Sequence, residues 1–105
     1  MSAVFLYVTF PNATEADHIC ERLVHEKNIA CANILAPMNS VYLWEGHLER
    51  STEVPVFLKT TSDKVHICID AIKKQHSYSV PCVVSLPIED GNPDFMKWIV
   101  DQVKP

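Results

Sequence analysis

Residues 29–61 read I-A-C-A-N-I-L-A-P-M-N-S-V-Y-L-W-E-G-H-L-E-R-S-T-E-V-P-V-F-L-K-T-T, and this stretch decides the fold. The segments on either side of Glu45-Gly46 are rich in Val, Ile, Leu, Thr and aromatic residues, which suit β-strands. Gly46 adopts a positive φ without steric cost, so the pair predicts a tight turn between two strands. Because Glu45 suits a type I′ turn poorly, we expect a type I turn with Gly46 as the left-handed bulge residue.

The predicted hairpin is longer than a domain of this size can contain. Each arm has about 15 residues and would extend about 50 Å, whereas strands usually have about 5–6 residues and a 105-residue domain has a radius of gyration near 13 Å. The arms must therefore bend or project beyond the core. Pro37 and Pro55 are each expected to interrupt one arm, because proline donates no ladder hydrogen bond.

The outer half of the hairpin is apolar on both faces. It carries Val41, Tyr42, Leu43, Trp44 and Leu48. An isolated two-stranded ribbon of this composition would be unstable and prone to association. We therefore expect another subunit to cover it.

Composition limits the function classes. The 105 residues, 48% of them hydrophobic, predict a single domain spanning 1–105. The net charge of −4 without a basic run argues against nucleic-acid binding, and no apolar run is long enough to span a bilayer. The four cysteines show no C-x-x-C spacing; Cys20 and Cys68 fall at apolar helix positions and are expected in the core. With no signal peptide and no disulfide framework, we expect a cytoplasmic protein.

The flanking segments alternate between strands and helices. Residues 3–10 form a near-continuous apolar run typical of a central strand, and residues 80–88 predict the last strand. Apolar residues at helical spacing follow the first strand, the hairpin and the last strand. Three caps are predicted to start these helices: Asn12 (or Thr14), Ser62, and Asn92 with Pro93 at the first helical position.

The resulting order is β-α-β, β-α-β and a terminal helix, with the long hairpin joining the two halves. Two right-handed βαβ units side by side give one antiparallel sheet with both main helices on one face. The sequence therefore predicts an α+β, ferredoxin-like sandwich with its first and third strands at the centre of the sheet.

Few residues indicate a metal-binding or catalytic role. His76 ends the second helix and Cys82 follows six residues later. His and Cys are frequent ligands of copper or zinc, but two groups are too few for a tight site, so capping and packing are the favoured explanation. No G-x-S-x-G, P-loop or dinucleotide motif occurs, and the chain has only two glycines. Glu89 and Asp90 precede Gly91-Asn92-Pro93, where a turn and a cap account for them. We predict no catalytic constellation.

An aromatic and polar set remains to be explained. Tyr42 and Trp44 alternate, so they share one face of the hairpin, while Lys59 and Tyr78 lie near the ends of other elements. Either these residues only pack at a subunit interface, or they line a ligand site there.

Several motifs resemble those of the CutA family, the divalent-cation tolerance proteins. The matching segments are A-C-A-N-I at 30–34, S-V-Y-L-W-E-G at 40–46, L-K-T at 58–60, V-P at 80–81 and L-P-I-E-D-G-N-P at 86–93. The resemblance covers nearly the whole chain. It implies a ferredoxin-like fold, a homotrimer built through the hairpin, an architecture similar to PII signalling proteins, a cytoplasmic location and a link to copper tolerance.

Two function classes stay open: a non-enzymatic trimeric sensor or scaffold that binds metal or a small ligand between subunits, and a small metabolic enzyme acting in those clefts. The copper ligands proposed for the family match this chain at one position. Val8 stands where some members have Cys, Gln75-His76 replaces a His-His pair, and Cys82 replaces a Glu. We expect weak copper binding, dominated by His76 with help from a Cys82 thiolate, and no firmly held cofactor.

The predicted site lies between subunits. Tyr42 and Trp44 are expected to lie too far out on the hairpin to reach Lys59, His76 or Tyr78 in their own chain. In a trimer, a neighbouring hairpin would deliver them. The resulting pocket, with aromatic walls, one cation and one imidazole, would suit a small anion or a soft metal.

Overall fold

A computed structural model describes residues 2–105. Its elements follow the predicted alternation, including the predicted break in the first arm of the hairpin. In chain order they are β1 (Ala3–Phe10), α1 (Ala13–His25), β2 (Cys31–Ile34), β3 (Met38–Trp44), β4 (His47–Thr61), the 3₁₀ turn η1 (Ser62–Lys64), α2 (Val65–Gln75), β5 (Val83–Pro87) and α3 (Pro93–Gln102). No helix in the described part of the chain is long and apolar enough to cross a membrane.

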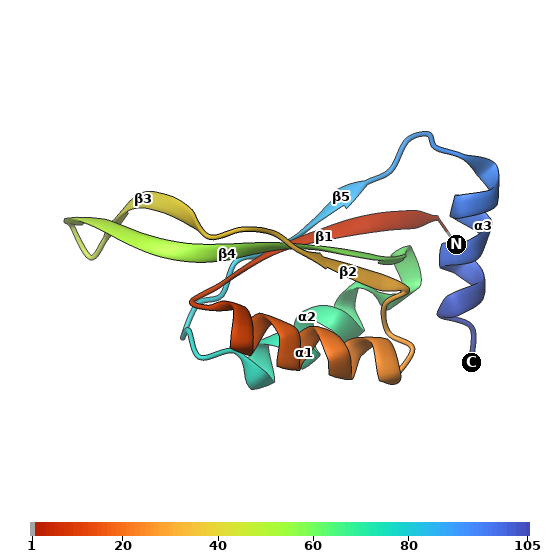
Figure 1. The fold of residues 1–105 in the computed structure, drawn as a ribbon, viewed down its shortest axis with the longest axis horizontal. Helices are drawn as coiled ribbons and strands as arrows, with labels where there is room; N and C mark the ends of the chain where they lie inside the picture. The colour runs from red at the N-terminus through yellow and green to blue at the C-terminus, as the bar shows by residue number, and fades with distance from the viewer. Residues whose placement is uncertain (1) are drawn as a thin grey trace.

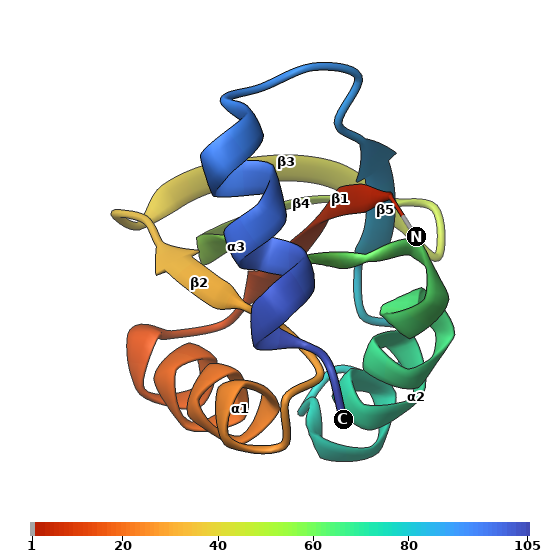
Figure 2. The ribbon, with the colours of Figure 1, turned by 90° about the vertical axis from the view of Figure 1, so that its right-hand side faces the viewer.

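The strands form an antiparallel sheet in the order β2-β4-β1-β5, with β3 paired to the outer half of β4. Both α1 and α2 lie against one face of this sheet, while α3 lies across the end opposite the hairpin tip (Figure 1 and Figure 2). The predicted ferredoxin-like α+β fold is confirmed, including β1 and β4, the first and third predicted strands, at the centre.

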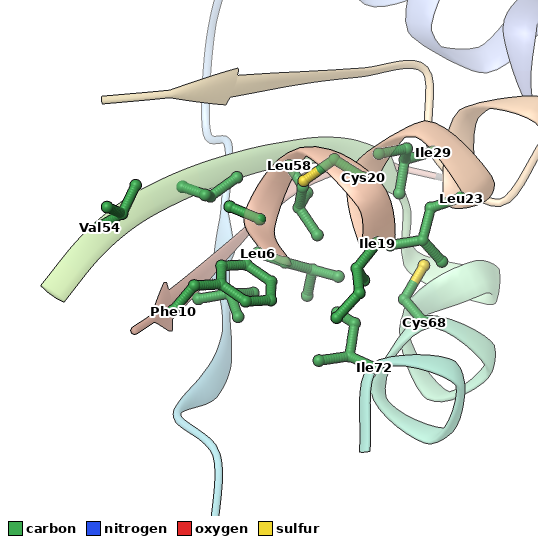
Figure 3. Close-up of a cluster of buried hydrophobic side chains, with 13 residues drawn as sticks. Leu6, Phe10, Ile19, Cys20, Leu23, Ile29, Val54, Leu58, Cys68 and Ile72 are labelled. Atoms are coloured by element: carbon green, nitrogen blue, oxygen red, sulfur yellow. The ribbon is translucent and has the colours of Figure 1, made fainter. Parts of the chain in front are cut away.

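The core fills the space between the sheet and its two helices (Figure 3). Alternate residues of β1 and β4 point toward the helices, and the apolar stripes of α1 and α2 meet them. The largest members are Leu6, Phe10, Ile19, Leu23, Ile29, Leu58 and Ile72, all almost fully buried. Each such side chain contributes roughly 1.5–3 kcal/mol through burial. Cys20 and Cys68 belong to this core, as predicted.

The hairpin extends the molecule to principal dimensions of 45 × 26 × 22 Å. Trp44 pairs with His47, so Glu45 and Gly46 alone form the loop, with φ values of 50° and 81°. Positive φ at both central residues defines a type I′ turn, and the prediction of a type I turn with a bulge was wrong. The twist of a type I′ turn matches that of paired strands, and this fit outweighs the poor preference of Glu45.

The two prolines act differently from one another. Pro37 lies in the break between β2 and β3, as expected, but Pro55 lies inside the continuous strand β4. The backbone carbonyl of Pro55 accepts a hydrogen bond from the Leu35 amide. A residue in a strand presents its N and O to the same side, so the Pro55 nitrogen faces the break in the other arm, where no ladder bond is lost. The predicted interruption at Pro55 was therefore wrong.

Two of the three predicted caps are confirmed. Asn12 Oδ1 accepts from the Glu15 amide at 2.8 Å and Asn92 Oδ1 accepts from the Asp94 amide at 3.0 Å. Ser62 instead begins the 3₁₀ turn, and its Oγ accepts from the amide of Ser2 at 3.3 Å. The last strand is also shorter than the predicted 80–88, because residues 80–82 form part of a loop.

Candidate functional site

His76 anchors the loop that follows α2. Its side chain is fully buried and its ring stacks on Phe10, with centroids 4.8 Å apart. The Tyr78 amide donates to His76 Nδ1 at 3.0 Å, while Nε2 lies 2.8 Å from the Thr9 carbonyl oxygen. An amide can only donate and a carbonyl can only accept, so this geometry assigns the proton to Nε2 and makes the ring neutral. Both ring nitrogens are thus used by the backbone, and metal binding would have to open one of these bonds.

Glu15 holds the same loop from the first turn of α1. Its Oε2 accepts from the amide and from the hydroxyl of Ser77, each at 3.1 Å, and lies 3.5 Å from His76 Nδ1. Because Glu15 is itself fixed by the cap at Asn12, a short local motif in α1 determines where the loop lies.

Tyr78 connects this loop to the hairpin. Its hydroxyl donates to Glu53 Oε2 at 3.0 Å. Burial, followed by the hydrogen bond and negative charge of Glu53, raises the pKa of Tyr78 to about 12. The phenol is therefore neutral at physiological pH and serves as a donor to the carboxylate.

A pocket of about 370 Å³ lies between the hairpin and the loop that follows α2. Its lining comes from β1, β3, β4 and the loop, and consists of Thr9, Tyr42, Trp44, Glu53, Tyr78, Ser79, Val80 and Cys82. Figure 1 shows the loop after α2 at the end of the sheet from which the hairpin extends.

The pocket corrects one prediction. Tyr42 and Trp44 line it together with Tyr78 of the same chain, so a neighbouring hairpin is not required to bring these three residues together. The reason is the path of the chain: the loop after α2 reaches the hairpin base, where Glu53 bonds to Tyr78. The length of the hairpin alone gave no indication of this approach.

Lys59 lies elsewhere. Its Nζ donates to Asn33 Oδ1 and lies 5.8 Å from the ring centroids of both Phe5 and Phe95. These neighbours belong to β2, β1 and α3, and none of them lines the pocket. Within one chain, the predicted site cation is therefore not brought to Tyr42, Trp44 or Tyr78.

Cys82 lines the pocket as a thiol. Burial and the nearby charge of Glu53 raise its pKa, so the protonated form dominates at neutral pH. Among residues 2–105, no three or more His, Cys, Asp and Glu side chains are grouped so that they could hold a metal ion. A tight metal site within one chain does not fit these residues.

Glu53 is the pocket residue that sequence reasoning missed. It pairs with Met38, and residues 38, 42 and 44 share one face of the hairpin, so Glu53 shares that face too. Once a two-residue loop is assumed, the register follows by counting from the turn. The two carboxylates on the aromatic face, Glu49 opposite Tyr42 and Glu53 opposite Met38, were therefore a signal present in the sequence.

Comparisons with known proteins agree with this architecture. The family model described as CutA1 divalent ion tolerance protein matches residues 4–102. The chain is 41% identical over 100 residues to the divalent-cation tolerance protein CutA of Archaeoglobus fulgidus, covering 95% of this chain and 97% of that one. It is 45% identical over 97 residues to a protein CutA homolog of Xenopus laevis, covering 92% of this chain but only 64% of that longer protein. A solved structure described as the periplasmic divalent cation tolerance protein CutA of Archaeoglobus fulgidus superposes with a TM-score of 0.94 at 40% identity, covering 97% of this chain and 99% of that one.

Proposed function

Because this chain belongs to the CutA1 divalent ion tolerance family, we propose that it is a non-enzymatic, cytoplasmic homotrimer that serves divalent-cation tolerance as a sensor or scaffold. Its four cysteines are all free, which suits a reducing compartment. The observation that supports a trimer is the uncovered apolar surface of the single chain. The pocket beside the hairpin is the proposed ligand site of the protein.

The sheet face opposite α1 and α2 supports assembly. Val84 pairs with Tyr7 and Leu86 pairs with Phe5, which places all four side chains on this face. Phe57 joins them, with its ring centroid 5.9 Å from that of Phe5 and 5.5 Å from that of Tyr7. Figure 1 shows no helix over this face except at the α3 end. Exposed apolar patches of this kind mark interfaces.

The hairpin tip continues this surface beyond the sheet. Its apolar residues are all exposed in the single chain, Leu43 most of all at 70%. In the proposed trimer, neighbouring copies would cover both the sheet face and the tip. In an isolated chain, the apolar side chains of the tip would remain in water.

The pocket supplies binding groups and no acid–base pair. Its lining contains one carboxylate and no lysine, arginine or histidine. We therefore propose weak copper binding through Cys82 and Glu53, with further donors from a neighbouring subunit; His76, the predicted main ligand, contributes only if one of its backbone bonds opens.

Light scattering tests the assembly. The purified chain is expected to have three times the mass of one subunit. Leu86→Lys should dissociate the trimer, since it places a charge on the uncovered sheet face, whereas Ile67→Lys on α2 should not. The two side chains are matched in exposure, at 43% and 47%. A subunit mass for the wild type, or equal behaviour of both variants, would contradict the proposal.

A further inference from the structure

We infer that the pocket beside the hairpin binds a small organic ammonium ion, with the Glu53 carboxylate as counter-charge and the rings of Tyr42, Trp44 and Tyr78 as its walls. The inference rests on the proposed function, because it names the ligand class of the same pocket. It replaces the small anion expected from the sequence, since that expectation depended on Lys59.

The charge of the pocket favours a cation. Glu53 is the one residue of the lining whose side chain carries a formal charge at neutral pH, since Cys82 and Tyr78 remain protonated. The bond from Tyr78 occupies one position on Glu53 Oε2, and a carboxylate offers about four lone-pair positions. The carboxylate therefore retains capacity for a ligand, and an anion would meet repulsion with no compensating positive group.

The aromatic walls favour an organic cation over a metal ion. The faces of Trp and Tyr rings attract ammonium groups through their quadrupoles, most strongly where water is excluded. A metal ion instead needs several donor atoms, and the described residues offer no such group. A pocket lined by three aromatic residues and one carboxylate suits a methylated ammonium, whose charge is spread over an apolar surface.

The pocket also has a suitable size and support. A volume of about 370 Å³ lies in the range of small-molecule sites, roughly 300–1,000 Å³. Two of its walls are fixed relative to each other, since Tyr78 is held by the His76 ring at one end and by Glu53 at the other. The ligand would thus enter a site that is largely formed before binding.

Choline and its uncharged carbon isostere, dimethylbutanol, provide the test. Each is titrated into the full chain, following heat and the intrinsic fluorescence of its two tryptophans, Trp44 and Trp98. We expect saturable binding of choline and affinity for dimethylbutanol lower by about tenfold or more, since the two differ mainly in the charge. Equal affinity for the two probes, or no saturable binding of choline, would overturn the inference, and this comparison needs no variant.

Matched variants locate the site. Glu53→Gln retains an acceptor for Tyr78 while removing the charge, and should weaken choline binding by about tenfold. Glu49→Gln is the control, because Glu49 lies opposite Tyr42 on the same face but outside the pocket lining. Trp44→Leu should likewise weaken binding, whereas Trp98→Leu on α3 should not. Equal loss in test and control variants would overturn the assignment.

Light scattering on the same samples separates this inference from the proposed function. A trimer that fails to distinguish choline from dimethylbutanol overturns the ligand class alone. A monomer that binds choline selectively overturns the proposed assembly and supports the ligand class.

Discussion

At the scale of single residues, His76 is the side chain on which the loop after α2 depends. It binds the backbone on both sides, at Thr9 in β1 and at Tyr78 in the loop, and its ring is packed between those of Phe10 and Tyr78. A histidine suits this position because a neutral imidazole offers one donor and one acceptor in a flat ring. Its role in one chain is to position the pocket wall.

His76→Ala is expected to cost about 2–4 kcal/mol in the free energy of unfolding, because it opens a cavity beside Phe10 and leaves the Thr9 carbonyl and the Tyr78 amide without partners. Urea denaturation measures the difference. His66→Ala is the control; His66 is exposed on α2, and its loss should change stability by less than about 0.5 kcal/mol. Equal stability of the two variants would show that the hydrogen bonds of His76 to the backbone do not contribute to the free energy of unfolding.

Tyr78→Phe tests the hydrogen bond to Glu53 and its dependence on pH. The pKa of Tyr78 in the folded chain, about 12, is above its ordinary value of 10.0, so the neutral phenol is favoured by folding. Its contribution is complete below pH 10 and is lost as the pH rises through about 12. We expect the variant to be about 1 kcal/mol less stable at neutral pH. The difference from wild type should shrink between pH 10 and 12; a constant difference across that range would contradict the assignment.

At the scale of elements, the hairpin and the loop after α2 together build the site. The face of the hairpin that carries Tyr42 and Trp44 also carries Glu53, and the loop contributes Tyr78 and Cys82. The register of β3 against β4 thus decides which carboxylate meets the aromatic rings. A shift by one residue would turn Glu53 to the other face, so the two-residue turn at the tip fixes the composition of the pocket.

The turn makes two substitutions informative because they should act in opposite directions. Gly46→Ala is expected to destabilise the chain by about 1–2 kcal/mol through its positive φ alone, since no atom lies within 4 Å of an added Cβ. Glu45→Asn should stabilise it by roughly 0.5–1 kcal/mol, because Asn tolerates the left-handed conformation that Glu45 adopts at φ 50°. Thermal unfolding of both variants measures the effects. A neutral Gly46→Ala would argue against the type I′ geometry.

The sequence predicted those features that depend on neighbouring residues. The caps at Asn12 and Asn92 are made within three residues of each side chain, and the strand order follows from the alternation of elements and the handedness of βαβ units. Ser62 was assigned wrongly because its partner, Ser2, is 60 residues away. No local pattern reveals such a contact.

The site was harder to predict for the same reason. Tyr42, Trp44, Tyr78 and Cys82 were selected for their chemistry, but their meeting in one chain depends on how the hairpin passes the loop after α2. The hydrogen bond that records this approach joins residues 53 and 78. Lys59 was selected for its charge but lies outside the pocket. Its place is beside Asn33 and Phe95, against α3.

At the scale of the whole molecule, a single chain leaves much apolar surface uncovered relative to its core. The core between the sheet and the two main helices is complete, but the opposite sheet face and the hairpin tip are not covered. If three copies cover these surfaces, folding and assembly are linked, and the stability of the chain must depend on its concentration.

Unfolding as a function of concentration therefore tests the trimer independently of its mass. For a trimer that unfolds to three chains, each tenfold increase in concentration adds about 2.7 kcal/mol per mole of trimer, so the unfolding midpoint should rise steadily. Leu43→Lys at the hairpin tip should lower the midpoint and reduce this dependence, because a lysine replaces the most exposed apolar side chain of the tip. Ile67→Lys on α2 should leave the dependence intact. A midpoint independent of concentration in the wild type would mean that one chain is stable alone, and the apolar hairpin would then need another partner.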